Sequence, residues 1–392
     1  MRRRRFSSLL GGTALASLAG VPAHADPSVG CGVPGVREDG WAVVSVDHDK
    51  LIDRSALCEA TDKLVASSAN IHSVLVARGG QLVFERYFKG LDEIPDDIFG
   101  RRVANVAFDA DTLHNVKSVS KSVVSLTVGI ALDRGLIRSV DEPIFSFFPE
   151  LADLRTPEKD RLLLRHALTM TMGLKWVEAT PDTGDEDNDE SRMHRAADPC
   201  RYVLDLPTTA PAGQEFFYNT GALTLVSAIV RKATGRPLDE LARAALFEPL
   251  GIAGVQWSRV KGDTDAGGGL RLRPRDMAKI GQLVLSGGRW NGRQIVSREW
   301  IETSTAPKIK AIADGFNGRY GYLWWLARSR VDGREVEWFA AQGRGGQYIR
   351  VVPDLDLVVV VTAGYYQDYS ARAGQVQFGA FRDVVRASLP HT

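Results

Sequence analysis

The spacing of apolar and polar positions divides this chain into a helical middle flanked by strand-forming ends. Near the start, apolar residues in 73–77 and 82–88 surround a Gly79-Gly80 turn, a pattern that predicts a β-hairpin. After residue 288, short apolar or alternating segments predict four more strands, at 320–326, 336–341, 347–352 and 355–362. We therefore expect an α/β (α+β) fold, in which one sheet is assembled from both ends of the chain around an inserted helical lobe.

The middle of the chain carries its apolar residues at helical spacing. The expected helices are 112–137, 161–170, 221–234, 238–250 and 276–285, with two more at 55–67 and 373–389. Polar composition predicts a loop over 90–111 and an acidic loop over 178–192. The aspartates of the acidic loop could mimic a calcium loop. They lack the spacing, central Gly and closing Glu of an EF-hand, so we favour a solvated loop.

The helical segment 112–137 carries a Ser and a Lys three residues apart. Ser118 and Lys121 form an S-x-x-K motif, and residues three apart share a helix face, with roughly 5–6 Å between Cβ atoms. The positions after Lys121 are apolar almost all round, so the helix should be buried. A buried helix that carries a Lys is a local conflict, and such conflicts often mark function. A second copy, Ser258 and Lys261, precedes a loop rich in Gly and Asp, and we interpret it as a chance repeat.

The first 25 residues have the composition of an export signal, the alternative being a disordered basic arm. Arg3-Arg4-Arg5-Phe6 fits the core of a twin-arginine signal, and Ala23-His24-Ala25 fits a cleavage site. We therefore expect a periplasmic or secreted protein that begins at Asp26. An oxidising compartment permits one disulfide among the three cysteines, and Cys31 and Cys58 are the nearest pair.

Charge and motif content narrow the function classes. The chain has a net charge of +1, and loss of the first 25 residues removes four Arg and no acid, which leaves a charge near −3. This balance does not support a nucleic-acid partner or an anionic membrane surface. No stretch of 18 apolar residues predicts a retained membrane span. The motifs G-x-S-x-G, H-E-x-x-H and G-x-x-x-x-G-K-[ST] are absent, so we expect no α/β-hydrolase triad, no metal and no nucleotide cofactor.

Two later stretches support the first S-x-x-K pair. Residues 211–221 form a polar turn that presents Tyr218 before a helix, and residues 341–347 form a Gly-rich segment before a strand. With Ser118 and Lys121, these motifs resemble the penicillin-recognising serine hydrolases. The resemblance is strongest to class C β-lactamases, family-VIII-type esterases and 6-aminohexanoate-dimer hydrolases. It covers about residues 68–365 and includes the segments 70–76, 118–122, 164–170, 266–270, 290–292, 345–349 and 352–357.

The resemblance implies a β-lactamase/transpeptidase-like fold, with an antiparallel sheet from both chain ends, flanking helices and an inserted all-helical lobe. On this basis we expect the sheet lobe at 26–130 and 285–392, the helical lobe at 131–284, and the active site at their junction.

The resemblance also implies a serine hydrolase that uses an acyl-enzyme. Ser118 would be the acylated nucleophile, and Lys121 would be its base or would tune it, since burial lowers the pKa of a Lys. Tyr218 would carry the proton to the leaving group, its phenolate favoured by Lys121. Lys121 should therefore lie within reach of both Ser118 and Tyr218.

Further residues are expected to hold the substrate. Gly345 and Gly346 would bring the strand edge close, so that the backbone N–H groups of Ser118 and Gln347 hold the oxyanion. The N–H of Arg344 is a rival donor. Asn219, beside Tyr218, is expected to contact the substrate.

Two departures from the lactamase motifs bear on the substrate. The lactamase Tyr-x-Asn has Thr220 at its third position here, and the lactamase Lys-Thr-Gly is replaced by Arg344-Gly345-Gly346, which has no Lys. Both changes remove groups that would bind a β-lactam. We therefore expect a carboxylesterase or amidase acting on a small-molecule ester or amide. The alternatives are a β-lactamase or D-Ala-D-Ala peptidase, or a catalytically silent ligand-binding module on the same fold.

Overall fold

The computed structural model describes residues 30–43, 52–94, 102–178, 186–313, 316–366 and 371–389. The predicted export signal, residues 1–25, lies outside these ranges. Residues Cys31–Thr392 form one compact unit. Within the described ranges, no helix is both long and apolar enough to cross a membrane.

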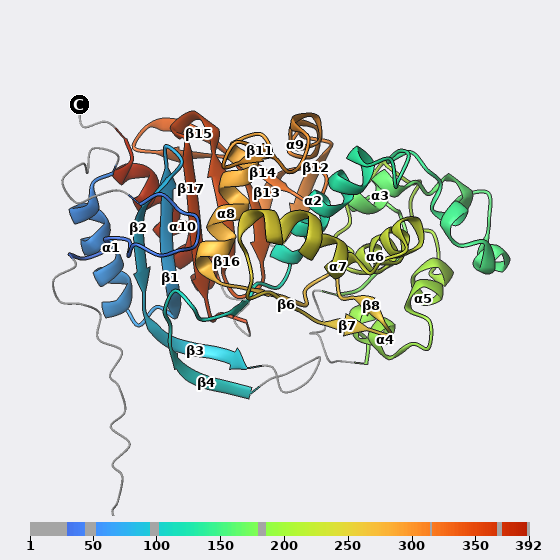
Figure 1. The fold of residues 1–392 in the computed structure, drawn as a ribbon. Helices are drawn as coiled ribbons and strands as arrows, with labels where there is room; N and C mark the ends of the chain where they lie inside the picture. The colour runs from blue at the N-terminus through green and yellow to red at the C-terminus, as the bar shows by residue number, and fades with distance from the viewer. Residues whose placement is uncertain are drawn as a thin grey trace, which may run out of the picture. The chain divides into compact units, whose positions relative to one another are not determined.

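Strands from both ends of the chain form one eight-stranded antiparallel sheet, as predicted (Figure 1). The strand order is β12-β13-β14-β15-β16-β17-β1-β2, so the N-terminal hairpin joins the C-terminal strands where β1 pairs with β17. The strands are β1 (Ile71–Arg78), β2 (Gln81–Tyr87), β12 (Ile309–Ala313), β13 (Phe316–Tyr320), β14 (Trp325–Val331), β15 (Arg334–Gly343), β16 (Gln347–Val352) and β17 (Leu357–Ala363).

Helices cover both faces of this sheet. All seven residues of β17 are buried, which a strand with both faces covered requires. Successive residues of β17 point to opposite faces of the sheet. On one face, Val359 and Val361 pack with α1 (Arg54–Ala66) and α10 (Ala371–Ala387). On the other face, Val358 and Val360 belong to the core that includes α2 (Val119–Asp133) and α8 (Pro274–Leu285).

The remaining helices gather beyond α2, away from α1 and α10 (Figure 1). Helix α2 contacts β15 and β16 of the sheet as well as α6 and α7, so it joins the two regions. These helices are α3 (Leu164–Leu168), α4 (Asp189–Arg195), α5 (Pro199–Asp205), α6 (Gly221–Thr234) and α7 (Leu238–Ala242), with α9 (Arg298–Ser304) packed on α2. Short strands are β5 (His114–Asn115), β6 (Gln256–Trp257), β7 (Arg259–Val260), β8 (Asp263–Thr264), β9 (Leu270–Leu272), β10 (Arg289–Trp290) and β11 (Arg293–Gln294).

The predicted loop over 90–111 is wrong, because this segment holds two strands. Strands β3 (Lys89–Ile94) and β4 (Arg102–Ala107) pair in an antiparallel hairpin outside the main sheet. Its Leu91 and Val103 are 53% and 54% exposed, so apolar alternation does not mark a buried face there. Backbone pairing, which the side-chain pattern does not reveal, defines these strands.

Two further boundaries differ from prediction. The predicted strand 320–326 instead contains the turn between β13 and β14, residues 321–324, in which Gly321 N donates to Trp324 O at 2.9 Å. The run is apolar because the side chains of Tyr320 and Trp324 are buried in the core. The acidic segment also contains the start of α4, which Asn188 caps by accepting a hydrogen bond from Ser191 N at 3.0 Å. Residues 179–185 of that segment lie outside the described ranges.

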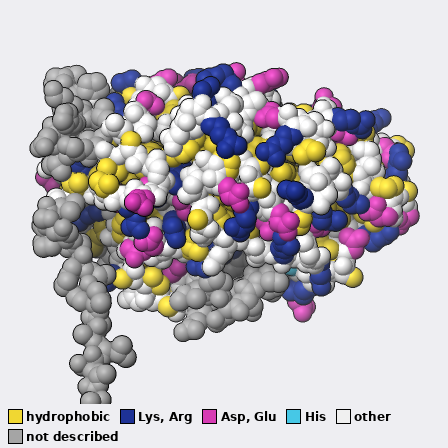
Figure 2. All heavy atoms as spheres, in the orientation of Figure 1, with side chains coloured by type: hydrophobic (Ala, Val, Ile, Leu, Met, Phe, Trp, Pro, Cys, Tyr) yellow, Lys and Arg dark blue, Asp and Glu magenta, His cyan; other side chains and the backbone are white. Residues whose placement is uncertain are grey.

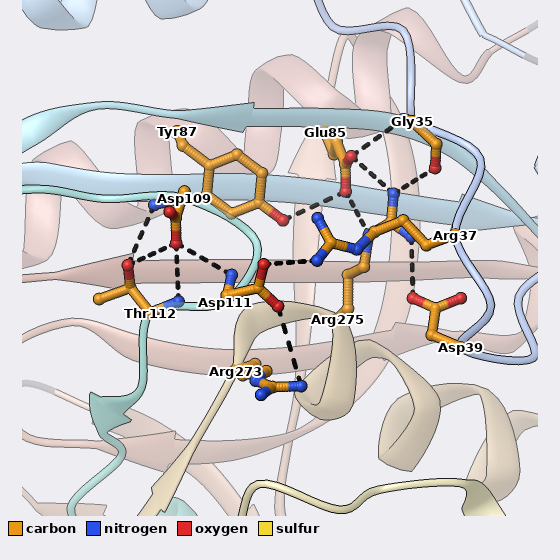
Figure 3. A network of polar contacts seen from close by, with 10 residues as sticks. All are labelled: Gly35, Arg37, Asp39, Glu85, Tyr87, Asp109, Asp111, Thr112, Arg273 and Arg275. Atoms are coloured by element: carbon orange, nitrogen blue, oxygen red, sulfur yellow. Dashed lines mark hydrogen bonds and ion pairs between the residues drawn. The ribbon is translucent and has the colours of Figure 1, made fainter. Parts of the chain in front are cut away.

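A disulfide and a buried arginine fasten segment 30–43 to the sheet. The predicted Cys31–Cys58 disulfide is confirmed, with 6.2 Å between the Cα atoms, and ties the segment to α1. Arg275 of α8 donates two 2.7 Å hydrogen bonds to Glu85 of β2 and one of 2.8 Å to Asp39 (Figure 3). It also donates to the backbone oxygen of Gly35 at 2.6 Å. One guanidinium therefore joins α8, the sheet and the segment.

Basic and acidic side chains are interspersed over the face shown in Figure 2. Ion pairs between such side chains occur in the helical region, as in Arg231–Asp263 and Lys232–Glu150, both at 2.5 Å. This mixed surface agrees with a chain whose acidic and basic residues nearly balance.

Candidate active site

Ser118 occupies the turn that starts α2. The preceding Lys117 has φ = +48°, a left-handed conformation that costs a non-Gly residue of order 1–3 kcal/mol. Neighbouring contacts hold this turn, since Lys117 N donates to Asn115 Oδ1 at 3.1 Å and Val116 N donates to Leu270 O at 3.0 Å. The apolar residues of α2 that follow are buried almost without exception, so the serine is presented from a fixed helix end.

Lys121 lies in direct contact with Ser118. Its Nζ is 2.8 Å from Ser118 Oγ and donates to Gly267 O at 2.6 Å. The Lys121 side chain is 2% exposed, and burial lowers its pKa against the opposing attraction of Glu178, Glu190 and Asp265. A buried amine beside a hydroxyl is the arrangement that general-base activation requires.

The segment before α6 brings Tyr218 to the same place. Lys121 Nζ lies 5.0 Å from the centre of the Tyr218 ring, and this ring stacks on Trp325 with 5.7 Å between centroids. The structure thus brings Ser118, Lys121 and Tyr218 together. The neighbouring Asn219 is 3% exposed, and its Oδ1 accepts a hydrogen bond from Ala222 N at 3.2 Å, so its side chain caps the start of α6.

The turn between β15 and β16 forms the third side of the site. Gly345 and Gly346 have φ of +84° and +98°, which only Gly adopts without strain. Gly343, to which the sequence analysis gave no role of its own within the segment 341–347, lies against the Ser118 turn. A Cβ at Gly343 would lie 2.2 Å from the backbone oxygen of Val116 and 3.2 Å from Ser118 N. Only a glycine therefore lets the end of β15 reach the nucleophile turn.

The two other predicted residues of this turn have their own partners. Gln347 is fully buried, pairs in register with Gly343, and donates through Nε2 to Ala363 O. Arg344 Nε donates to Tyr366 O at 2.6 Å, so part of the Arg344 guanidinium is bound to the segment that follows β17. Both side chains therefore hold the turn in place through backbone oxygens of the segment 363–366.

Sequence reasoning missed Glu178, which it assigned to the solvated acidic loop. Its carboxylate accepts hydrogen bonds from Thr220 N at 2.7 Å, Thr220 Oγ1 at 2.9 Å and Trp176 Nε1 at 2.5 Å. Burial, together with the charge of Glu190, raises the pKa of Glu178 to about 7. The apolar residues just before it were the available signal, because a carboxylate that follows buried residues such as Trp176 need not be solvated.

The second S-x-x-K copy has no comparable geometry. Lys261 lies in the exposed turn between β7 and β8 with φ = +50°, and Ser258 Oγ contacts Asp265 and Gly269 rather than the lysine. Across the part of the chain that the structure describes, no group of three or more His, Cys, Asp or Glu is arranged to hold a metal ion.

Sequence comparison identifies a family and several relatives for this chain. The sequence profile of the family named Beta-lactamase matches residues 72–376. The 6-aminohexanoate-dimer hydrolase of Paenarthrobacter ureafaciens is 27% identical over 339 residues, which cover 80% of this chain and 77% of that protein. Esterase EstB of Burkholderia gladioli is 28% identical over 185 residues, which cover 45% of this chain and 44% of that protein.

A solved structure shows the same fold at lower identity. The D-amino acid amidase from Ochrobactrum anthropi SV3 matches with a TM-score of 0.62 and 16% identity, over 84% of this chain and 99% of that chain. At this level of identity the likeness concerns the fold alone.

Proposed function

We propose, from the premise that this chain belongs to the beta-lactamase family, that it cleaves a small-molecule ester or amide through an acyl-enzyme on Ser118. As a member of that family with relatives of esterase and amidase type, it is a hydrolase. The observation that carries the finer proposal is the 2.8 Å contact between Lys121 Nζ and Ser118 Oγ inside a buried site.

Acylation would begin with proton transfer from Ser118. Neutral Lys121 takes the Oγ proton as Oγ attacks the carbonyl carbon, which turns the carbonyl oxygen into an oxyanion. The bond to the leaving group then breaks, and the proton passes from Lys121, by way of Tyr218, to the departing oxygen or nitrogen. The leaving group departs as a neutral alcohol or amine, and the acyl group remains on Ser118.

Water would complete the cycle. The attacking water gives one proton to the Lys121–Tyr218 pair, and its oxygen bonds to the acyl carbon. The bond between that carbon and Ser118 Oγ then breaks, and the same proton passes to Ser118 Oγ. The carboxylic acid is released and the resting enzyme is restored. Every proton is returned within the cycle, so this chemistry needs only residues of this chain and water.

The oxyanion would be held by backbone N–H groups at the junction of α2 and β15. Ser118 N supplies one donor, and the end of β15 supplies the second. The tight approach of Gly343 to Ser118 N supports a donor at this end of the strand, close to the N–H of Arg344 or Gln347 proposed from the sequence.

The ester or amide preference rests on what surrounds the nucleophile. The Gly-rich turn carries Arg344 in place of a lactamase-type Lys, and that guanidinium is engaged with Tyr366 O. Asn219 caps α6, and Trp325 stacks on Tyr218 and adds an apolar wall. Together with relatives named as an esterase and as a 6-aminohexanoate-dimer hydrolase, these contacts favour an ester or amide over a β-lactam.

The test compares substrates and nucleophile variants. Wild-type protein should hydrolyse a nitrophenyl ester faster than a chromogenic cephalosporin, and a fluorophosphonate probe should add one label that intact mass places on Ser118. Ser118→Ala should lose the label and at least about 10⁴-fold of turnover. A cephalosporin rate far above the ester rate would favour a lactamase. Absence of both label and turnover in the wild type would favour a silent binding module.

We also propose that the protein is exported by the twin-arginine route. The Cys31–Cys58 disulfide supports this, because such bonds persist in oxidising compartments. Protein recovered from the periplasm or medium should begin at Asp26, and replacement of Arg3 and Arg4 by Lys should retain the uncleaved chain in the cytoplasm. Cleavage and export of that variant at wild-type levels would refute the route.

A further inference from the structure

We propose that Glu178 is a positioning residue of the catalytic centre: its carboxylate holds the Tyr218 turn and balances the positive charge that Lys121 gains when it takes the proton of Ser118. The inference rests on the proposed function and deepens it, since it gives the hydrolase a fourth functional side chain, one that acts through Lys121 rather than on the substrate.

The hydrogen bonds of Glu178 fix it to the segment that presents Tyr218. Thr220, two residues after Tyr218, donates both its backbone N–H and its hydroxyl to the carboxylate, at 2.7 and 2.9 Å. Trp176, buried at 2% exposure, donates its indole N–H to the same group. Three donors and no basic side chain surround the carboxylate in these contacts, an arrangement that orients a charge without neutralising it.

Packing connects this carboxylate to Lys121. A Cβ on Gly267 would lie 2.3 Å from Thr220 Cγ2, so Thr220 rests against the Gly267 backbone. The carbonyl of that same glycine accepts the 2.6 Å hydrogen bond from Lys121 Nζ. Glu178 therefore contacts Thr220, Thr220 rests against Gly267, and Gly267 contacts Lys121. This chain of contacts links the half-buried carboxylate to the buried amine.

The charges around the pair favour this assignment. Three carboxylates attract the Lys121 ammonium, with Glu178 contributing most, then Glu190 of α4, then Asp265. The face of the Tyr218 ring lies 5.0 Å from Nζ, and the hydroxyl of Ser118 lies 2.8 Å from it.

In the described part of the chain, charged groups of both signs act on the Glu178 carboxylate. Glu190 repels its carboxylate and Lys121 attracts it, while the buried Tyr320 hydroxyl at the end of β13 also senses its charge. Burial lowers the pKa of Lys121 and raises that of Glu178, so both charged forms are costly unless each faces the other.

The proton count gives the role of this pair in the reaction. The active form has neutral Lys121 beside ionised Glu178. When Lys121 takes the Ser118 proton, an isolated buried ammonium would be unfavourable, whereas the negative charge of nearby Glu178 stabilises the ammonium. The carboxylate therefore raises the proton affinity of Lys121 at the moment of attack. The same attraction sets the pH below which Lys121 is already protonated and cannot act as the base.

The test is the pH profile of kcat/KM for Glu178→Gln, which keeps an acceptor for Thr220 but removes the charge. We expect the acid limb to move about one unit or more to lower pH, because loss of an opposite charge lowers the pKa of Lys121. We also expect the plateau to fall by about tenfold or more, because Lys121 becomes a weaker base. The control is Asp276→Asn, which removes another buried carboxyl, on α8. Asp276 is not among the charges that shift the pKa of Lys121, so this variant should leave the acid limb in place.

The other outcomes are also decisive. A fall in rate with an unshifted acid limb would make Glu178 only a structural hydrogen-bond acceptor and would overturn the inference, as would a wild-type profile. If the Gln variant does not fold, Glu178→Asp, which keeps the charge but withdraws it by one methylene, should place the acid limb below that of the wild type, and an unmoved limb would refute the role. Failure of the proposed function would look different, since wild-type Ser118 would then take no label.

Discussion

Removal of the Arg275 guanidinium should unfasten the N-terminal segment from the sheet. The Arg275→Met variant keeps the aliphatic packing of the side chain but removes all of its hydrogen bonds. Arg275 is 3% exposed and Glu85 is 9% exposed at their side chains, so the variant leaves a carboxylate buried without its cation. Glu85 would retain only Gly35 N and the Tyr87 hydroxyl, both at 3.1 Å (Figure 3).

The size of the effect follows from the burial of the pair. Loss of one partner from a buried ion pair costs about 3–5 kcal/mol. A unit of about 360 residues unfolds with an entropy near 0.75 kcal/mol per kelvin, so about 4 kcal/mol lowers the melting temperature by about 5 °C. Arg273→Met is the matched control. Arg273 is 37% exposed and lies 3.9 Å from Asp111, so its loss should cost at most about 0.5 kcal/mol, a shift below about 1 °C.

Differential scanning calorimetry should measure the melting temperatures of Arg275→Met, of Arg273→Met and of the double variant Arg275→Met, Glu85→Gln. The double variant should recover part of the loss, because it removes the buried charge that the single variant leaves unpaired. An Arg275→Met melting temperature within 1 °C of the Arg273→Met value would refute the reasoning. So would a double variant that is less stable than the single one.

Three other predictions concern the site and the disulfide. Lys121→Met should abolish ester turnover yet raise the melting temperature at acid pH, where the Glu178 carboxyl is protonated. Burial lowers the pKa of Lys121 in the folded state, so the ammonium destabilises the fold most at low pH. This destabilisation disappears as the pH rises past the pKa of Lys in the unfolded chain, about 10.4. Calorimetry of both proteins across pH measures the difference. Gly343→Ala should reduce kcat/KM by about 10²-fold, since its Cβ would lie 2.2 Å from a backbone oxygen of the nucleophile turn. Gly374→Ala, whose Cβ meets nothing within 4 Å, should leave kinetics unchanged and add up to about 1 kcal/mol of stability. Replacement of Cys31 and Cys58 by Ser should cost about 3.5 kcal/mol for a separation of 27 residues, and denaturation midpoints with and without reductant measure it.

Local pattern predicted the elements whose side chains face a core. Strand β16 occupies the predicted residues 347–352, and helix α6 occupies the predicted 221–234. Both contain apolar residues at the period of their element, because a buried face needs them there. The β3–β4 hairpin was missed since its apolar side chains are half exposed, and 320–326 was misread since the turn buries aromatic residues. The spacing of apolar residues indicates which positions are buried. It predicts secondary structure wrongly where an exposed segment forms strands or a turn is buried.

The sequence by itself determined the family and the contact between Ser118 and Lys121, because these two residues share one helix face and their spacing is set within a single turn. Only the tertiary structure decided what completes the site. Thr220 and Glu178 are 42 residues apart, and Gly267 and Lys121 are 146 apart, so no local pattern connects them. By its sequence neighbours Glu178 belongs to an acidic, solvated loop, whereas in the fold its carboxylate is half-buried and accepts hydrogen bonds from Thr220 and Trp176. The charge and geometry of this site are properties of contacts between distant segments, and those contacts exist only once the sheet and the helices have assembled.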